Sequence, residues 1–212
     1  MSNTFGRRTE TFESGVPVWR GVPKRVVGVG KLLNTLVEGE NYPVGSPCSL
    51  EAANGVKILP IWKVKATEVT GGTNTQITVY RADGLYELKA GMMVMIMPAT
   101  VAGTGKAIEV TTLTNTVAGE STFTVVTANI DAVTVGAYLA LSSSTTAGSS
   151  KSLYCQPTHL TYSQILIGEG DTIATASPVY EGYVFEKRIP FLPAIVKANI
   201  RLNTDIYFDN VI

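Results

Sequence analysis

The stretch 75-TQITVYRADGLYELKAGMMVM-95 decides the fold, because it returns in altered form as 122-TFTVVTANIDAVTVGAYLAL-141. Each copy has a Thr-x-Thr-Val pattern or a near equivalent, followed by polar and turn residues. A glycine then appears (Gly91 or Gly136), and a short apolar run follows it. Runs rich in Thr and Val that are separated by turn residues are typical of β-strands, so each copy is predicted to consist of strands joined by turns.

The repeat extends toward the N-terminus, where Glu68-Val69-Thr70 precedes the first copy and Glu109-Val110-Thr111 precedes the second. The copies are offset by 41 residues at this first strand, by 46 at the Thr-Val pair and by 45 at the glycine, which a loop insertion reconciles. Each copy is then a three-strand unit with one apolar face, which it cannot bury alone. Two units packed together predict a six-stranded barrel or sandwich, with strands at 63–70, 76–81, 92–97, 106–112, 122–127 and 136–141. The alternative is a chance resemblance among strands rich in Thr and Val.

The segments on either side of this region predict one further domain. The expected fold class is therefore mainly β, with the barrel or sandwich inserted into a small α+β base domain. The one persuasive helix lies in 191-FLPAIVKANIRLN-203, where Pro193 suits the first helical position. The predicted parts are an extended basic arm (1–24), a base (25–62 with 152–212), the inserted unit (63–141) and a flexible linker rich in Ser, Thr and Gly (142–151).

Composition and charge restrict the classes of function. Charged residues make up 16% of the 212 residues, against about 25% in an average soluble domain, which predicts extensive burial, some of it against other subunits. Residues 1–31 hold six basic and two acidic side chains. This basic arm suits an acidic protein surface or a solvated tail, and nucleic acid is the weaker idea because interleaved aromatic platforms are missing. The longest apolar run, 92-MMVMIMPA-99, is too short to span a bilayer, so no membrane partner is expected, and it predicts a strand buried on both faces.

The inventory of chemically reactive side chains is nearly empty. His159 is the only histidine, and neither Ser163 nor Cys155 near it sits on a recognisable activating turn. Cys48 and Cys155 are expected to be free, buried thiols, and a zinc site would need more nitrogen and sulfur ligands than these three side chains. The segment 28-GVGKL-32 fails the spacing of a phosphate loop. We therefore expect no catalytic residue, no cofactor and no metal, which indicates a structural or binding protein.

Three stretches resemble the head fiber or head decoration proteins of tailed bacteriophages. They are the turn 43-PVGSPC-48, the β-region of the TQITV…LKAGMMVM kind, and the closing module 181-EGYVFEKRIPFLPAIVKANIRLNTDIYF-208. The resemblance implies a non-enzymatic virion protein on the capsid exterior, made in the cytoplasm of the host bacterium. It further implies the major capsid protein as partner and a homo-oligomer, commonly a trimer. The chain has no coiled-coil heptads or collagen-like repeats, which favours a compact decoration protein over a long fibre.

On this hypothesis the arm and the closing module grip the capsid while the inserted unit projects outward. Aromatic and branched apolar side chains near these segments are the expected capsid or subunit contacts, and two arginines of the arm are expected to steer the approach electrostatically. These predicted interface residues are Arg7, Arg8, Val18, Trp19, Phe185, Ile189 and Phe191.

Two other classes of function remain open at this point. The first alternative is a receptor- or carbohydrate-binding module whose 63–141 unit contacts a host-surface glycan. The aromatic residues available to it there are Tyr80, Tyr86, Phe123 and Tyr138. The second is a hydrolase, which rests on His159 alone, since the acidic pairs Glu169/Asp171 and Glu181/Glu186 have no evident aromatic sugar platform around them.

Overall fold

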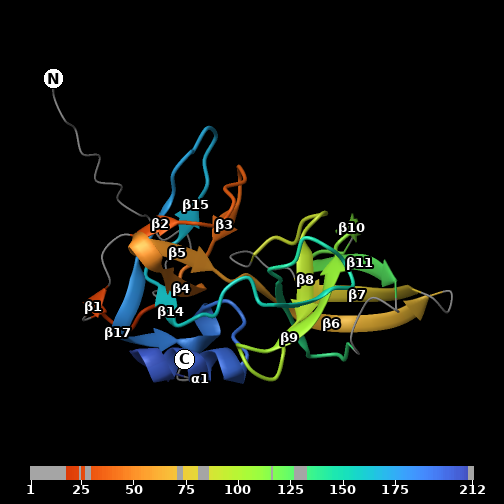
Figure 1. Ribbon diagram of the computed structural model, residues 1–212. Helices are drawn as coiled ribbons and strands as arrows, with labels where there is room; N and C mark the ends of the chain where they lie inside the picture. Colours follow the sequence, from red (N-terminus) through yellow and green to blue (C-terminus); the bar gives the residue numbers. More distant parts are fainter. Residues whose placement is uncertain are drawn as a thin grey trace.

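The computed structural model of the protein describes residues 18–23, 25–26, 30–70, 74–80, 86–115, 117–126 and 133–209. Within these ranges the chain is mainly β, as the sequence predicts, and it has a single α-helix, α1 (Ala194–Asn203). Two eight-stranded sheets lie side by side, and α1 runs along the lower margin of the first sheet (Figure 1).

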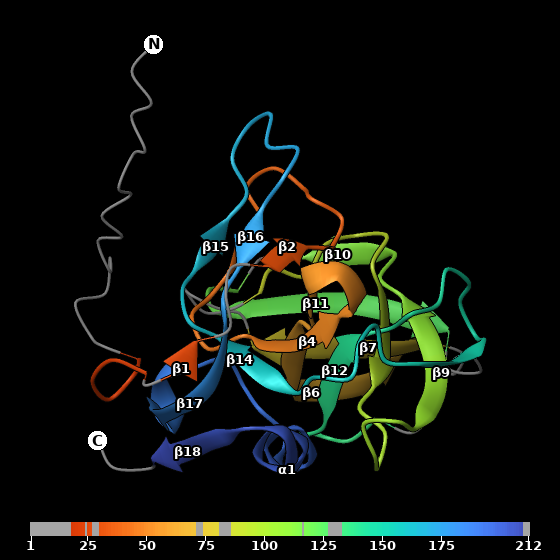
Figure 2. The same ribbon diagram turned by 60° about the vertical axis from the view of Figure 1, so that its left-hand side comes forward.

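The first sheet joins segments from both ends of the chain. Its order is β1-β17-β14-β4-β5-β2-β16, and β18 pairs in parallel with β17 at the outer margin (Figure 2). The strands are β1 (Arg25–Val26), β2 (Gly30–Leu32), β4 (Pro47–Glu51), β5 (Gly55–Ile58), β14 (His159–Thr161), β16 (Thr175–Ala176), β17 (Pro178–Phe185) and β18 (Asp205–Asp209). Two further strands, β3 (Asn41–Tyr42) and β15 (Ile165–Leu166), form a small antiparallel ladder of their own.

Helix α1 begins one residue later than the sequence predicts. Pro193 occupies the N-cap position instead of the first helical position, with extended backbone. Val196 and Ile200 are both buried, one turn apart, as the 3.6-residue period requires. The helix therefore presents one apolar side to the sheet, and β18 follows directly after its C-cap.

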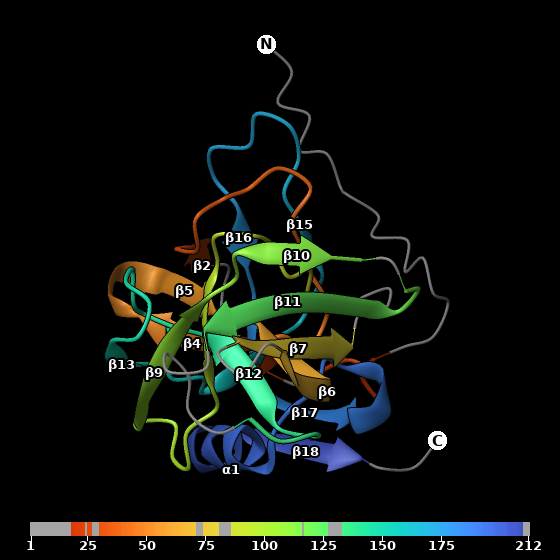
Figure 3. The same ribbon diagram turned by 90° about the vertical axis from the view of Figure 1, so that its right-hand side faces the viewer.

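The second sheet consists of consecutive segments in the order β10-β11-β7-β6-β12-β8-β9-β13 (Figure 3). The strands are β6 (Ile61–Thr70), β7 (Asn74–Tyr80), β8 (Met93–Ile96), β9 (Thr104–Glu109), β10 (Thr112–Thr114), β11 (Glu120–Val126), β12 (Tyr138–Leu141) and β13 (Ser150–Ser152). Strand β8 is buried on both faces, as predicted, because Val94 belongs to one hydrophobic cluster and Met95 to the other.

The pairing in the second sheet corrects the predicted offset of the first strand. Thr78 and Thr124 are 46 residues apart, as are their partners Ala66 and Thr112 on β6 and β10. The offset at the first strand is therefore also 46, and the prediction of 41 with a loop insertion is wrong. The two Glu-Val-Thr triplets are alike in sequence but do not occupy equivalent positions. The pairing between strands determines which positions are equivalent.

The glycines of the two copies occupy equivalent turns. The Gly91 N–H donates to the Val110 carbonyl at 2.8 Å, and the Gly136 N–H donates to the Val64 carbonyl at 3.0 Å. Their φ angles of +84° and +86° lie in the left-handed region that favours glycine. Val64 and Val110 are 46 residues apart and both fully buried, so the turn and the residue it contacts recur together.

The segment 142–152 is more ordered than its composition predicts. Ser150–Ser152 pair with β9 as strand β13, and Ser142 bridges to Leu153. The Ser144 hydroxyl donates to the Thr146 carbonyl at 2.9 Å and accepts from the Thr146 N–H at 3.0 Å. Hydroxyl side chains of Ser and Thr satisfy nearby backbone groups in turns, so a tract that resembles a flexible linker in composition is here a hydrogen-bonded turn and an edge strand.

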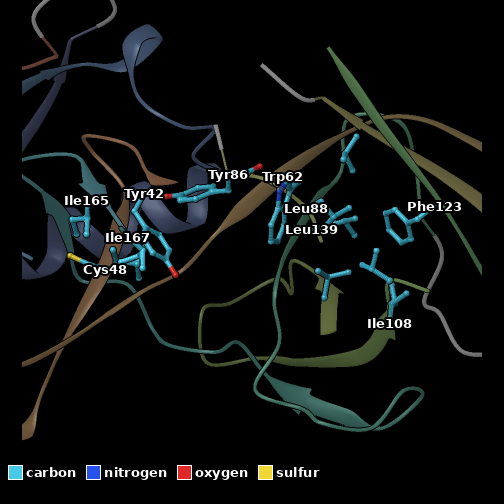
Figure 4. Close-up of a cluster of buried hydrophobic side chains, with 14 of the residues drawn as sticks. Tyr42, Cys48, Trp62, Tyr86, Leu88, Ile108, Phe123, Leu139, Ile165 and Ile167 are labelled. Carbon is cyan, nitrogen blue, oxygen red and sulfur yellow. Dashed lines mark hydrogen bonds between the residues drawn. The ribbon is translucent and has the colours of Figure 1, made fainter. Parts of the chain in front are cut away.

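The two sheets share their hydrophobic core. The first cluster runs from Leu32 and Val56 in the first sheet to Leu139 and Phe123 in the second. Where the sheets meet, the Tyr86 ring lies edge-on to both Tyr42 and Trp62, each with centroids 6.3 Å apart (Figure 4). The Trp62 indole N–H also donates to the Tyr86 carbonyl at 3.0 Å. The inserted unit is therefore packed against the rest of the chain through a continuous apolar interior.

Candidate interaction surface

Part of the predicted N-terminal arm belongs to the first sheet. Trp19 forms an antiparallel bridge with Val184 of β17. Backbone hydrogen bonds lie on either side of this bridge, from Arg20 to Tyr183 at 2.8 Å and from Phe185 to Val18 at 2.9 Å. Arg7 and Arg8, the predicted steering residues, lie outside the described residues.

Trp19 is a core residue of its own chain. Only 5% of it is exposed, and its indole N–H donates to the Tyr162 carbonyl at 3.2 Å. The ring lies over Gly182 of β17, where an added Cβ would approach ring atoms to 3.3 Å. Glycine at this position thus leaves room for the indole. Trp19 anchors residues 18–23 to the base and is not available to a partner at the surface.

The structure brings four of the predicted interface residues together at this end of the first sheet. Ile189 is 8% exposed and, with Val18, lies close to Gly45. Phe185 is half-buried, with the Arg188 guanidinium 4.4 Å from its ring centroid. Trp19 completes the group, which is largely buried, so its members stabilise the edge of the sheet more than they expose an apolar patch.

Phe191 lies elsewhere, at the contact between the two sheets. Its ring is 5.9 Å from that of Tyr80 on β7, and the Lys63 ammonium of β6 is 5.7 Å from its centroid. The loop before α1 is therefore held against the second sheet by an aromatic pair and a cation–π contact. The structure does not bring Phe191 together with the other four residues.

The outer face of β17 and β18 carries a stacked pair of exposed aromatic side chains. Tyr183 is 44% exposed and Tyr207 is 54% exposed, and their ring centroids are 5.0 Å apart with planes inclined by 20°. The two strands are parallel and in register here, so side chains at paired positions project to the same side. These two tyrosines are not among the interface residues predicted from the sequence. The strand alternation in 181-EGYVF-185 and 205-DIYFD-209 is the signal that identifies them as outward-facing.

Charged groups flank the tyrosine pair at both ends. Glu181 and Asp205 are paired positions two residues before the tyrosines, on the same face. At the other end, the Arg20 guanidinium reaches the Asp209 carboxylate at 3.3 Å across β17. The inner side of the two strands is apolar and buried, with Val184 and Ile206 toward α1. The outer face is thus an aromatic strip between charged groups, the mixture of Tyr and Arg that is enriched at protein interfaces.

The side chains weighed from the sequence as possible reactive groups, His159 and the two cysteines, are buried. Burial lowers the pKa of His159 to about 4, so the imidazole is neutral at neutral pH. A 2.7 Å hydrogen bond joins its Nδ1 to the Thr158 hydroxyl, and its ring lies edge-on to Tyr180. Cys48 and Cys155 are free and buried, as predicted, and burial raises the pKa of the Cys155 thiol to about 12. Neither thiol has the low pKa that a nucleophilic cysteine requires.

The acidic pairs have structural contacts. The Glu186 carboxylate accepts a hydrogen bond from the Lys197 ammonium on α1. The Asp171 carboxylate accepts from the Gly168 N–H at 2.7 Å and closes a turn. Across the described ranges there is no group of three or more His, Cys, Asp or Glu side chains that could hold a metal ion.

The aromatic residues considered for glycan binding by the 63–141 unit are mostly covered. Tyr86 and Phe123 are buried in the core, and Tyr138 is half-buried. Tyr80 is the most exposed of them, and its ring packs against Phe191 and lies under the Lys65 ammonium. The described part of the second sheet therefore lacks an exposed pair of rings comparable with that on β17 and β18.

Comparisons with protein-family models, with curated proteins and with solved structures find no match for this chain. Among the described residues, no helix is long and apolar enough to cross a membrane. The function is therefore inferred from the chain's own surface and from the sequence resemblance.

Proposed function

We propose that this chain is a non-enzymatic virion protein of a tailed bacteriophage, which binds the outer surface of the capsid as a head decoration or head fiber protein. The observation that carries the proposal is the exposed Tyr183–Tyr207 strip on β17 and β18. Both strands belong to the closing module, 181–208, whose sequence resembles that family. An exposed aromatic strip between charged groups is the kind of surface that anchors one protein on another.

The second sheet fits the role of the outward-presented part. We propose that residues 63–141 form a six-stranded barrel from a duplicated three-strand unit, on an α+β base. The strand path supports this, because it begins at β10 and ends with β9 and β13, and Val110 and Thr111 alone separate β9 from β10 in sequence. The register also supports it. Ile77 faces Phe123 and Met95 faces Ala140, so residues one repeat apart meet directly, as two-fold related copies require.

In this proposal the protein stabilises the capsid shell, because it docks at many equivalent sites on it. Each copy needs to bury about 1,200–2,000 Å² against the shell for stable binding, and the sum over many copies opposes the internal pressure of packaged DNA. A homotrimer and the major capsid protein as partner are part of this proposal.

The test is co-sedimentation of the purified chain with isolated heads of the phage that encodes it. We expect the wild-type chain to pellet with heads and to be a trimer by light scattering. A deletion of residues 1–17 is the appropriate arm variant, because residues 18–20 are hydrogen-bonded to β17. We expect this variant to fold and to bind heads more weakly. Wild-type protein that stays in the supernatant at all head concentrations would falsify the proposal.

A further inference from the structure

The outer edge of β18 lies next to the tyrosine strip. In the part of the chain that the structure describes, β18 pairs with β17 and with no other strand. One row of its backbone N–H and C=O groups is therefore not used in the sheet. Such an edge accepts an added strand from another chain, which supplies main-chain hydrogen bonds, while pockets for alternate side chains give specificity.

The side chains beside this edge are acidic and aromatic. Asp205, Tyr207 and Asp209 are two residues apart and project to the same outer face. Asp209 is 15% exposed and paired with Arg20, whereas Asp205 is exposed and has no ion pair among the described residues. Along β18, an added strand would therefore lie beside the acidic group of Asp205 and then beside the aromatic ring of Tyr207.

The rest of the chain indicates what such a ring binds. Basic side chains lie over the exposed or half-buried rings of Phe185 and Phe208, with the Arg188 and Arg201 guanidinium carbons at 4.4 and 5.2 Å from the ring centroids. Tyr207 contacts Tyr183 on one side, and no cation of the described residues lies over either ring. A basic side chain from outside would gain a cation–π contact with Tyr207 and a carboxylate partner in Asp205.

We propose that the β18 edge, with Asp205 and Tyr207, receives an extended segment of the capsid protein that carries a lysine or arginine. This inference rests on the proposed function and names the chemistry of the partner. A second copy of this chain bound through the same edge is disfavoured by charge. Two antiparallel β18 strands centred on Tyr207 would bring Asp205 of one copy beside Asp209 of the other, and like charges directly opposite are destabilising.

The experiment measures the dissociation constant for isolated heads of four variants, two at the edge and two matched controls. Asp205→Lys reverses the charge and Tyr207→Ala removes the ring, and each is expected to weaken binding by about tenfold or more. The control Glu169→Lys also reverses an acidic charge, and the control Ile173→Ala truncates an exposed apolar side chain; both lie in the loop between β15 and β16. Their binding is expected to equal that of the wild-type chain.

A second measurement identifies the occupant directly. A photo-reactive phenylalanine at position 207 is expected to cross-link, on heads, to a capsid-protein peptide that contains a lysine or arginine. The inference is overturned if both edge variants bind heads like the wild-type chain, if the cross-link joins two copies of this chain, or if Tyr207→Ala abolishes binding to a glycan array without changing head binding. Absence of wild-type binding to heads has a different meaning, because it removes the proposed function and this inference together.

Discussion

The second sheet is assembled from strands that follow one another within residues 61–152, whereas the first sheet joins segments that are far apart in the chain. In the first sheet, for example, the Ser46 N–H donates to the Thr161 hydroxyl across 115 residues. The second sheet repeats one pattern of pairing at a spacing of 46. In the proposed function, the regular second sheet is the outward-presented part, and the first sheet is the base that carries the β18 edge.

At the contact between the two regions, equivalent positions of the two units carry different side chains. Trp62 pairs with Leu139, and Ile108, 46 residues later, pairs with Val94. The larger Trp62 side chain reaches Tyr86 at the contact with the first sheet, while Ile108 contacts the interior of the second. If the two units are copies of one another, the first copy carries the tryptophan that attaches the second sheet to the base.

The largest loss of stability is expected when the buried tryptophan of either sheet is removed. Trp19→Ala in the first sheet and Trp62→Ala in the second should each lower the free energy of unfolding by about 3–5 kcal/mol, because each removes a buried indole and its hydrogen bond. Since the two sheets share a core, both variants should unfold in a single urea transition monitored by circular dichroism. The conservative change Ile108→Val should cost only about 1 kcal/mol. Two separate transitions in either tryptophan variant would contradict a shared core.

Acid is expected to lower the free energy of unfolding by about 3 kcal/mol, through protonation of His159 in the first sheet. The His159 pKa of about 4 lies below its unfolded value of 6.5, so the unfolded chain takes up the proton first as the pH falls. Stability is therefore complete above pH 6.5, is lost between pH 6.5 and 4, and changes no further below pH 4 from this cause. His159 is buried on β14, and its Nε2 has no hydrogen-bond partner among the described residues.

The matched variant for this prediction is His159→Gln, which cannot gain the charge. The free energy of unfolding should be measured by urea titration at pH 7 and pH 4.5 for both proteins. Carboxyl groups titrate in the same window, so the difference between the two proteins isolates the histidine. Equal losses on acidification in both would show that His159 does not cause the acid sensitivity.

A smaller loss of stability is expected at the two turn glycines, and it tests whether the two units are equivalent. Gly91→Ala and Gly136→Ala should each cost about 1–2 kcal/mol, because alanine disfavours positive φ and no heavy atom within 4 Å adds a steric term. The two losses should be equal within error, since the turns are equivalent. Gly91→Asn and Gly136→Asn should lose less, because asparagine tolerates the left-handed region. A marked difference between the two alanine variants, measured by thermal unfolding, would count against equivalent copies.

The sequence predicts the second sheet well, because the information is local. The six candidate strands fall on β6 to β12, but the candidate 106–112 spans the end of β9 and the start of β10, and β13 is not predicted. The register is harder to predict. It depends on which residues face each other across strands, and short Thr- and Val-rich triplets resemble one another by composition. That is why the triplets at 68–70 and 109–111 suggested the wrong offset.

The first sheet and the candidate surface are less accessible to sequence reasoning. Trp19 in a segment without periodicity resembles an exposed anchor, and only the glycine at position 182 on a distant strand makes room for it in the core. Tyr183 and Tyr207 are 24 residues apart, so their stacking depends on β18 returning parallel to β17 after α1. Alternation predicts that each side chain points outward, but the pairing of the strands cannot be read from either segment alone.

The smallest effect concerns a hydroxyl pair that occurs only once in the two copies. The Thr78 and Thr122 hydroxyls are 3.0 Å apart across β7 and β11, whereas Thr124, the repeat counterpart of Thr78, faces Gln76. Thr122→Val should therefore cost up to about 1 kcal/mol, because it leaves the half-buried Thr78 hydroxyl without this partner. Thr124→Val should be close to neutral, since valine favours strands. The double variant Thr78→Val with Thr122→Val should recover most of the loss, because replacing both partners of a hydrogen bond leaves no unpaired group. Urea midpoints at a constant slope give these differences, and equal losses for Thr122→Val and Thr124→Val would show that the hydroxyl pair does not contribute to stability.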